Sequence, residues 1–387
     1  MFVYLDNAAT AKVSKVALDA MMPYLTDSYG NPSTVYSIGR DAKNAVEVSR
    51  RAIAKGIGAI PEEIYFTSGG TESINWAIKS AVETQKTKGR HIITSAIEHA
   101  AVLKTCKFLE KNGYDVEYLG VDERGQISID ELRGAIRSDT ILITIMTANN
   151  EVGTILPVSE IGKIANENGV LFHTDAVQAV GHIPVDVRGI NADMLSFSGH
   201  KLGGAKGIGV LYIKKGLRLP PFIHGGGQER GGRSGTENVA GIASAAAVLE
   251  DVLPRLPLSG VAKLRDKLIE GVLKIPRSRL TGDPVNRLPG IASFVFEGVE
   301  GESMLLLLDQ CGICASSGSA CTSGSLDPSH VLLAMGLSHE TAHGSLRFSL
   351  SEDSNDDDIG YVLEKLPGII AKLRAISPLW EQGDEDR

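Results

Sequence analysis

Strand-like and helix-like segments alternate through roughly the first 250 residues, and this alternation limits the fold more than any other feature of the sequence. Short apolar, β-branched runs predict strands, and the apolar periodicity between them predicts helices. Strands are predicted at 63–67, 91–95, 114–119, 140–147, 169–173, 193–197 and 208–213, and helices at 41–57, 72–87, 99–111, 128–137 and 158–168. Elements in this order build a mostly parallel sheet covered by helices. We therefore expect an α/β fold.

The remainder of the 387-residue chain indicates a second, smaller domain, because a chain of this length exceeds one hydrophobic core. A long alanine-rich helix is predicted at 237–254, and Pro254 and Pro257 mark a boundary after it. Helices are predicted at 260–274, 301–311 and 355–376, and strands at 291–297 and 344–349, which is typical of an α+β domain. We expect a large ligand-binding domain at 13–254 and a small domain made of 1–12 and 255–387.

Charge and cysteine content exclude several classes of protein. The net charge of −8 argues against a nucleic-acid or anionic-membrane partner. No apolar run is long enough to cross a membrane, and the start MFVYLDNAAT lacks the form of a signal peptide, so we expect a soluble protein of the cytoplasm. The four cysteines are then free thiols. The pair Cys311 and Cys314 is weak evidence for a metal and is better explained by packing.

A glycine-rich turn follows the strand predicted at 63–67. Residues 67–72 read Thr-Ser-Gly-Gly-Thr-Glu and lead into a helix. Free N–H groups of Gly70 and Thr71, with the Thr71 hydroxyl, suit a phosphate dianion at the positive end of that helix. The turn lacks the Gly-Lys-Ser/Thr of a nucleotide-triphosphate loop. Taken alone, it would be an ordinary capped turn.

Two further polar clusters follow predicted strands, where ligands bind in such sheets. In His-Thr-Asp-Ala-Val-Gln at 173–178, Asp175 is placed to keep a pyridinium nitrogen protonated, and Gln178 to reach the phenolic oxygen of the same ring. In Ser-Phe-Ser-Gly-His-Lys at 196–201, Lys201 lies among small residues near a strand end, where a desolvated amine forms a Schiff base readily. An acid as a helix cap and a lysine as a surface charge are the plainer alternatives. A phosphate cradle, a pyridinium acid and a Schiff-base lysine together indicate a pyridoxal-phosphate (PLP) enzyme.

Over nearly its whole length the sequence resembles the NifS/IscS-like cysteine desulfurases, class V aminotransferase relatives among the fold-type I PLP enzymes. The motifs that carry the resemblance are YLDNAAT at 4–10, GNPSTVYSIGR at 30–40, TSGGTES at 67–73, IEHAAV at 97–102, NNEVGT at 149–154, HTDAVQ at 173–178, SFSGHK at 196–201, GGGQERGGRSGTEN at 225–238 and SSGSACTSG at 316–324. The resemblance implies the PLP fold type I, with PLP in the large domain and a cysteine-bearing loop in the small one.

Roles for individual residues follow from the same resemblance. It implies that Lys201 carries PLP, that His99 stacks on the ring and moves protons, and that Asp175 and Gln178 contact the ring as argued above. The residues implied to bind the phosphate are Gly70, Thr71, Ser198 and His200, with Thr236 reaching in from a second subunit. The active site would therefore depend on a homodimer. A structural role is the alternative for the two histidines.

The substrate would be held by Asn150 and Arg347, which resemble a clamp for an α-carboxylate. Arginine suits this task because its planar fork makes two parallel charge-assisted bonds. Arg347 interrupts an apolar strand pattern, where an unpaired charge is costly, so a structural salt bridge is the alternative.

Cys321 distinguishes this chemistry from that of its relatives. It lies in a loop of small polar residues, whereas an inert buried cysteine is usually flanked by apolar ones. As a thiolate it would be the nucleophile. The sequence thus predicts conversion of L-cysteine to L-alanine, with the sulfur held as a persulfide on Cys321 and passed to an acceptor thiol for iron–sulfur cluster, thio-cofactor or tRNA biosynthesis.

Other functions remain open at this stage. A selenocysteine lyase or an aminotransferase would share Lys201 and Asp175, but an aminotransferase has no need of Cys321. A non-catalytic sulfur carrier or scaffold would not need these residues intact. A metal-binding module built on Cys311, Cys314 and Cys321 is the weakest alternative.

Overall fold

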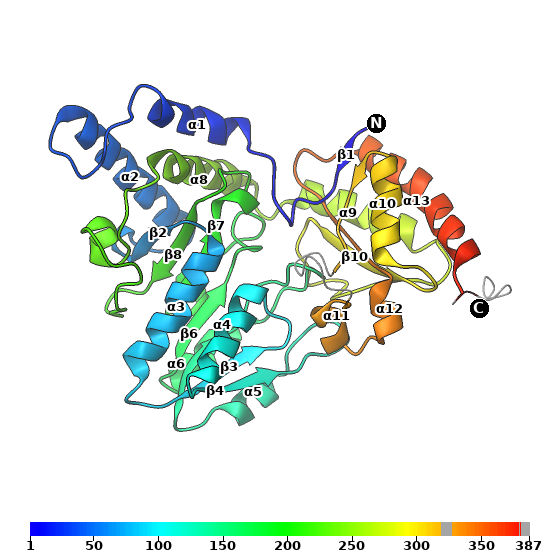
Figure 1. Cartoon of the computed structure of the whole chain (residues 1–387), viewed down its shortest axis with the longest axis horizontal. Helices are drawn as coiled ribbons and strands as arrows, with labels where there is room; N and C mark the ends of the chain where they lie inside the picture. The colour runs from blue at the N-terminus through cyan, green and yellow to red at the C-terminus, as the bar shows by residue number, and fades with distance from the viewer. Residues whose placement is uncertain (319–326, 379, 381–387) are drawn as a thin grey trace.

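The computed structural model describes residues 1–318, 327–378 and 380. It has a larger part, built on a seven-stranded sheet, and a smaller part, built on a three-stranded sheet, side by side (Figure 1). Within the described residues, none of the helices combines the length and the apolar character that a membrane span requires.

The large sheet confirms the predicted α/β architecture. Its strands are β2 (Ile64–Thr67), β3 (His91–Ser95), β4 (Asp115–Leu119), β5 (Thr140–Thr144), β6 (Leu171–Asp175), β7 (Met194–Ser198) and β8 (Gly209–Ile213), in the order β2-β8-β7-β6-β5-β3-β4. Strand β8 is antiparallel to both β2 and β7, and the other pairs are parallel. The carboxyl ends of the remaining six strands therefore share one edge.

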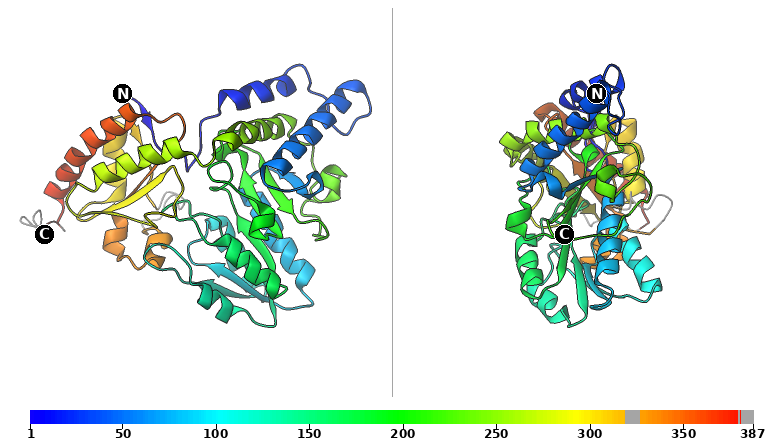
Figure 2. Two further views of the ribbon diagram at one scale, coloured as in Figure 1. Left: turned by 180° about the vertical axis from the view of Figure 1, so that it is seen from behind. Right: turned by 90° about the vertical axis from the view of Figure 1, so that its left-hand side faces the viewer.

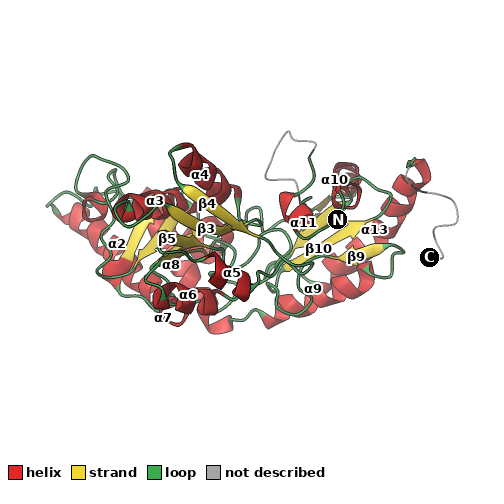
Figure 3. Cartoon of the chain, turned by 90° about the horizontal axis from the view of Figure 1, so that it is seen from below, coloured by secondary structure: helices red, strands yellow, loops and turns green. Residues whose placement is uncertain are grey.

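Helices cover both faces of this sheet, because adjacent residues of a strand point to opposite faces and both kinds are buried here. Ile92 packs with α3 (Gly70–Gln85) and α4 (Ala100–Lys111), whereas Ile93 faces the other side. The second face carries α2 (Ser37–Gly56), α6 (Val158–Glu167) and α8 (Val239–Val252). The two helical layers are visible on either side of the strands in Figure 3.

Shorter elements complete the large part. Helix α1 (Lys15–Leu25) packs on α8 and begins at Ser14, whose side chain accepts a hydrogen bond from the Ala17 N–H. The other two helices are α5 (Ile129–Ala135) and α7 (Val187–Ile190). Helix α1 was not among the predicted elements.

The small part centres on β10 (Ile291–Phe296), which lies between β9 (Ser278–Leu280) and β12 (Ser345–Ser349), antiparallel to both. Its helices are α9 (Ser259–Val272), α10 (Gly301–Gln310), α11 (His330–Ala334), α12 (His339–His343) and α13 (Asp356–Ile376). Strand β1 (Val3–Tyr4) pairs in parallel with β11 (Ile313–Cys314), so the N-terminus lies against the C-terminal part (Figures 1 and 2). One buried apolar cluster includes side chains from both sheets, such as Phe172 and Phe348.

Strand β5 ends earlier than predicted. The apolar run continues through Ile145 and Met146, but the strand ends at Thr144, although the Ile145 N–H still donates to the His173 carbonyl of β6 at 3.2 Å. Ile145 and Met146 remain buried, so the run of buried apolar residues that predicted a strand extends past the end of the strand itself. The departure from the sheet brings Met146 and Ala148 to the wall of the main pocket.

Candidate active site

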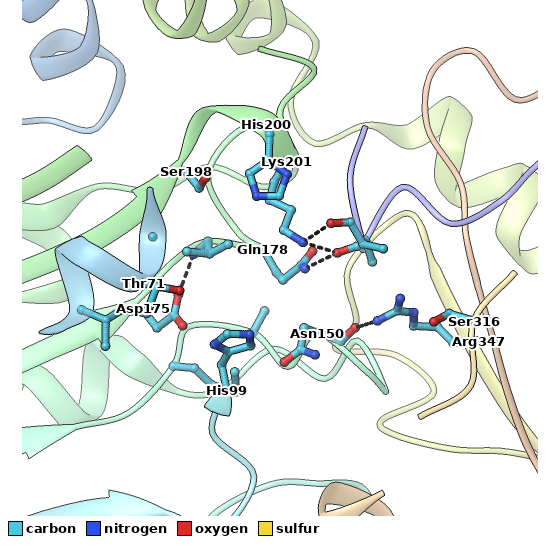
Figure 4. Close-up of a pocket in the computed structure, with 17 residues that line it drawn as sticks. Thr71, His99, Asn150, Asp175, Gln178, Ser198, His200, Lys201, Ser316 and Arg347 are labelled. Carbon is cyan, nitrogen blue, oxygen red and sulfur yellow. Dashed lines mark hydrogen bonds between the residues drawn. The ribbon is translucent and has the colours of Figure 1, made fainter. Parts of the chain in front are cut away.

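A pocket of about 320 Å³ opens at the carboxyl edge of the large sheet, where the small part meets it (Figure 4). Among the residues that line it are ten predicted site residues: Gly70, Thr71, His99, Asn150, Asp175, Gln178, Ser198, His200, Lys201 and Arg347. Two predicted residues are not in this group. Thr236 is exposed and does not line the pocket, and Cys321 lies outside the described residues.

Lys201 ends a short 3₁₀ turn, Gly199–Lys201, that follows β7. Its ammonium donates hydrogen bonds of 2.6 Å to the carbonyl oxygens of Ala8 and Ala9. Figure 4 shows the side chain extended across the pocket toward this N-terminal segment. The amine is therefore held in the middle of the cavity by backbone oxygens, without a carboxylate in those two bonds.

Asp175 is the last residue of β6 and is almost fully buried. Its Oδ1 accepts a hydrogen bond of 2.9 Å from the Val177 N–H, which fixes the carboxyl plane at the strand end. Burial raises the pKa of the Asp175 carboxyl, while nearby His99 and Lys201 act in the opposite direction. A cation placed beside this carboxyl would keep it ionised.

His99 precedes α4 and caps it, since its Nδ1 accepts a hydrogen bond of 3.1 Å from the Ala101 N–H. That bond leaves the proton of the neutral ring on Nε2. Burial lowers the pKa of His99, an effect that Asp175 opposes and Lys201 strengthens. The ring is thus a neutral imidazole with an Nε2–H donor beside Asp175.

The N-terminus of α3 forms the opposite wall. The helix begins at Gly70, two residues earlier than predicted, so Gly70 and Thr71 lie in the first turn, where N–H groups lack helical partners. A Cβ on Gly70 would lie 2.7 Å from Cγ2 of Val177, so a side chain there would collide with the pocket wall. A second hollow, which shares Gly70 and Thr71 with the pocket, extends past this turn toward Lys206.

The surroundings of the α3 N-terminus suit an anion. Glu72, an acid in the same turn, is neutralised by Arg233 through bonds of 2.7 and 3.1 Å. His200 is bonded to the Thr10 hydroxyl at 3.1 Å, and burial, with Lys201 and Lys206, lowers its pKa to about 4. Among the described residues that line the second hollow, Glu72 is the acid, and it is paired, so the positive end of the helix dipole can face a phosphate there.

Arg347 closes the pocket on the side of the small part. It donates from Nη1 to the carbonyl oxygen of Asn150 at 2.7 Å and from Nη2 to Asp6 at 2.9 Å, while its Nε is buried without a partner in the described part of the chain. The structural salt bridge considered above thus exists. A guanidinium has four N–H donors on its two Nη atoms, so one on Nη1 and one on Nη2 remain for a bound carboxylate.

Several pocket groups escaped sequence reasoning. The carbonyls of Ala8 and Ala9 act through the backbone, which residue type does not reveal, and only the YLDNAAT motif could have indicated them. Gln178 was expected at a ring oxygen, yet here its amide nitrogen donates to the Ala8 carbonyl at 2.9 Å. Ser316 also lines the pocket, and backbone bonds hold it against Arg347.

These groups fit PLP. The α3 turn with Ser198 and His200 can hold its phosphate, Asp175 its ring nitrogen and Lys201 its aldehyde carbon. Arg347 is left for a carboxylate. Fold and site together therefore define a PLP-dependent enzyme.

Comparison with known proteins identifies the family. Residues 3–362 match the family described as Aminotransferase class-V. The chain is 55% identical over 379 residues to "Cysteine desulfurase IscS" of Methanosarcina thermophila, covering 97% of this chain and 94% of the relative. It is 50% identical over 384 residues to "Cysteine desulfurase IscS" of Clostridium botulinum, covering 98% and 97%.

Solved structures agree. A "NIFS-LIKE PROTEIN" superimposes with a TM-score of 0.90 at 40% identity, covering 96% of this chain and all of that one. The structure "SspA in complex with cysteine" superimposes with a TM-score of 0.81 at 39% identity, covering 90% and 98%. The chain therefore belongs to the aminotransferase class-V family and, within it, to the IscS/NifS-like cysteine desulfurases.

Proposed function

We propose that this cysteine desulfurase converts L-cysteine to L-alanine, with Cys321 as the residue that takes the sulfur as a persulfide and passes it to an acceptor thiol. The observation that carries the proposal is the layout of one pocket. Lys201, Asp175 and the α3 turn gather on one side, and Arg347 offers free donors on the other (Figure 4). This layout supports an amino acid bound by its carboxylate, with its Cα beside the lysine.

Substrate binding is assigned to Arg347 and Asn150. The two Nη donors of Arg347 that Asp6 and Asn150 leave free can bind the α-carboxylate. Asn150 keeps its side-chain amide for the substrate, because its backbone carbonyl is the group that accepts from Arg347.

Proton movement is assigned to Lys201 and His99. Bound in this pocket, PLP supplies an electron sink next to Cα. Nζ of Lys201 removes the Cα proton, and the carbonyls of Ala8 and Ala9 provide a place where the resulting ammonium is stabilised. His99 holds a proton on Nε2 and is a donor for protonation of the substrate.

Sulfur transfer is assigned to Cys321. Its thiolate attacks the sulfur of L-cysteine, an S–S bond forms, and the Cβ–S bond breaks with its electron pair left on the substrate. Cβ then takes up a proton and Cα regains the proton that Lys201 removed, so the products are L-alanine and a persulfide on Cys321. An acceptor protein with a free thiol takes this sulfur onward, and an iron–sulfur scaffold is one such acceptor.

The test is to incubate the PLP-loaded protein with L-cysteine and dithiothreitol and to measure sulfide and alanine together. The thiol reduces the persulfide and releases sulfide, so equal amounts of both products are expected. Cys321→Ala should lose both and retain bound PLP, and Cys314→Ala serves as the thiol control. The assignment fails if the PLP-loaded wild type forms neither product, or if Cys321→Ala turns over normally.

We also propose that the protein acts as a homodimer, with Thr236 of each subunit contacting the phosphate held by the other. Apolar side chains are exposed along α1 and before α2, among them Leu18, Met22, Leu25, Tyr29 and Val35, the last being 86% exposed. A patch of this kind on one face supports association. The exposed position of Thr236, away from the pocket of its own chain, is compatible with a contact made in a partner.

Subunit mixing tests the shared site. Lys201→Ala and Thr236→Ala subunits are each impaired in pure form, but a hybrid dimer restores one complete site. Recovery of about a quarter of wild-type activity in an equal mixture, with a dimer mass by light scattering, supports the proposal. A monomer mass, or no recovery after confirmed subunit exchange, contradicts it.

The remaining assignments concern organisation and location. We propose that 13–254 forms a PLP-binding domain and that 1–12 joins 255–387 in a second domain, since β1 pairs with β11. We place the protein in the cytoplasm. Limited proteolysis tests the first proposal, because cleavage near residue 254 should precede cleavage inside either part.

A further inference from the structure

Glu151 follows Asn150 of the proposed carboxylate clamp and lies beside Gly318 and Ser329. These two residues flank the stretch 319–328, called the Cys321 segment below. Glu151 belongs to the NNEVGT stretch and is 4% exposed. Burying a carboxylate costs free energy unless hydrogen bonds or a charge partner stabilise it. The groups around Glu151 therefore indicate which part of the chain this carboxylate positions.

One contact is with Ser329, which follows the Cys321 segment. The Ser329 hydroxyl donates to Oε2 of Glu151 and accepts from the N–H groups of Val331 and Leu332 at 3.1 and 3.3 Å, as the N-cap of α11. The single hydroxyl proton of Ser329 is thus donated to Glu151. This bond holds Ser329, and with it the start of α11, in place after the Cys321 segment.

Gly318, which precedes the segment, lies beside the same carboxylate, while its N–H donates to the Ser345 hydroxyl at 3.3 Å. A Cβ on Gly318 would lie 3.1 Å from Oε2 of Glu151 and 2.9 Å from Cβ of Ser329, so the three residues meet at one point. Gly318 precedes Cys321 by three residues in the sequence, so this point lies at the start of the segment that carries the proposed nucleophile.

The same point is joined to the substrate clamp. The backbone of Ser316, two residues before Gly318, exchanges two hydrogen bonds with Arg347, at 3.1 and 2.6 Å. Arg347 in turn donates to the carbonyl of Asn150, the neighbour of Glu151. The carboxylate clamp and both ends of the Cys321 segment thus form one connected unit.

From these contacts we propose that Glu151 is a positioning residue for sulfur transfer: it holds Ser329 and packs against Gly318, and so keeps the described residues on either side of the Cys321 segment in place relative to Arg347. The proposal rests on the proposed desulfurase function. Glu151 contacts neither substrate nor cofactor in this role, so its loss should slow sulfur transfer and leave substrate binding and Cα deprotonation unchanged.

The test separates these steps in the PLP-loaded protein. Exchange of the Cα proton of L-alanine with deuterated water, followed by NMR, reports on Lys201 without any need for Cys321. Single-turnover formation of persulfide from L-cysteine, measured by mass spectrometry, reports on transfer. For Glu151→Ala we expect transfer to fall at least tenfold, with exchange and the KM for L-cysteine within twofold of wild type.

Matched variants define the contact. Glu151→Gln keeps the size and an acceptor for Ser329, so it should restore transfer to within threefold of wild type. Ser329→Ala removes the donor and should reproduce the defect of Glu151→Ala, which keeps the proposal testable should Glu151→Ala not fold. Ser338→Ala removes the equivalent cap of α12, away from Glu151, and controls for the loss of a helix cap.

The outcomes are distinct. Transfer within twofold of wild type in Ser329→Ala or in folded Glu151→Ala overturns the positioning role, as does an equal fall in transfer and in proton exchange. Absence of alanine formation in the wild type itself would instead contradict the desulfurase assignment.

Discussion

Oδ1 of Asp6 accepts a hydrogen bond of 2.9 Å from Nη2 of Arg347, although the two residues are 341 positions apart in the chain. The pair joins the start of the chain to β12 and lies at the edge of the pocket. The same N-terminal segment supplies the carbonyls of Ala8 and Ala9 to Lys201. The first ten residues therefore orient both the arginine and the lysine on which the proposed chemistry depends.

Asp6→Asn should raise the KM for L-cysteine about tenfold or more and change kcat much less. The amide removes the charge that fixes the plane of the Arg347 guanidinium, and a charge-assisted hydrogen bond contributes about 1.5–3 kcal/mol. Steady-state alanine formation over a range of L-cysteine concentrations measures both constants. Asp139→Asn, which alters an exposed pair with Arg137, is the control. An unchanged KM would show that Arg347 is oriented without Asp6.

Side-chain chemistry at strand ends was predictable from the sequence. An apolar run followed by polar and small residues predicts the end of a buried strand, where ligands bind in such sheets. Asp175 and Ser198 each end a strand as this pattern indicates, and Lys201 follows Ser198 in the next turn. Strand β3 has the predicted bounds, 91–95, and its five residues are all buried.

What the sequence could not supply are contacts that only the folded chain creates. The Asp6–Arg347 pair joins distant segments, and nothing in the local pattern of either residue indicates the other. Helices α11 and α12 have five residues each, too few for a periodic signal, and depend on their caps Ser329 and Ser338. Cys321 lies outside the described residues, so its role as the sulfur acceptor stays a prediction.

Asp175→Asn should lower kcat for alanine formation by about 100-fold or more while PLP remains bound. Asparagine fills the same volume and can still accept from the Val177 N–H, but it lacks the negative charge that a protonated ring nitrogen requires. The measurement is kcat at saturating L-cysteine, with PLP content determined by absorbance after release. A kcat within threefold of wild type would remove Asp175 from the proposed machinery.

Glu229→Ala should destabilise the fold by about 3 kcal/mol, because it removes the buried partner of Arg50 and leaves only the half-exposed Glu47, at 3.1 Å, to offset the charge. Glu229 accepts from Arg50 at 2.8 and 2.9 Å and from the Phe66 N–H at 2.9 Å, and its own φ is 45°, an uncommon value for a residue with a side chain. Denaturant unfolding gives the free-energy change. Asp251→Ala, in an exposed pair with Arg255, should cost at most about 1 kcal/mol. Equal losses in both variants would contradict the argument.

Glu98→Gln should stabilise the protein relative to wild type, and the gain should grow as the pH rises. Glu98 is fully buried; Oε1 accepts from Ser95 and Met146 at 2.7 and 2.9 Å, while Oε2 has no partner in the described part of the chain. Burial raises its pKa to about 8 from an ordinary value of 4.5. Between these two values the unfolded chain releases the proton and the folded chain keeps it, so wild-type stability falls as the pH rises.

Glutamine carries no such proton, so the difference between variant and wild type should be smallest near pH 4.5 and level off above about pH 8. Each pH unit in that range contributes at most about 1.4 kcal/mol. Denaturant unfolding at about pH 5 and about pH 8 measures the difference, with Glu167→Gln on the surface of α6 as the control for loss of one acid. A difference that is the same at both pH values would mean that Glu98 is already ionised in the folded protein at about pH 5, and would contradict the raised pKa.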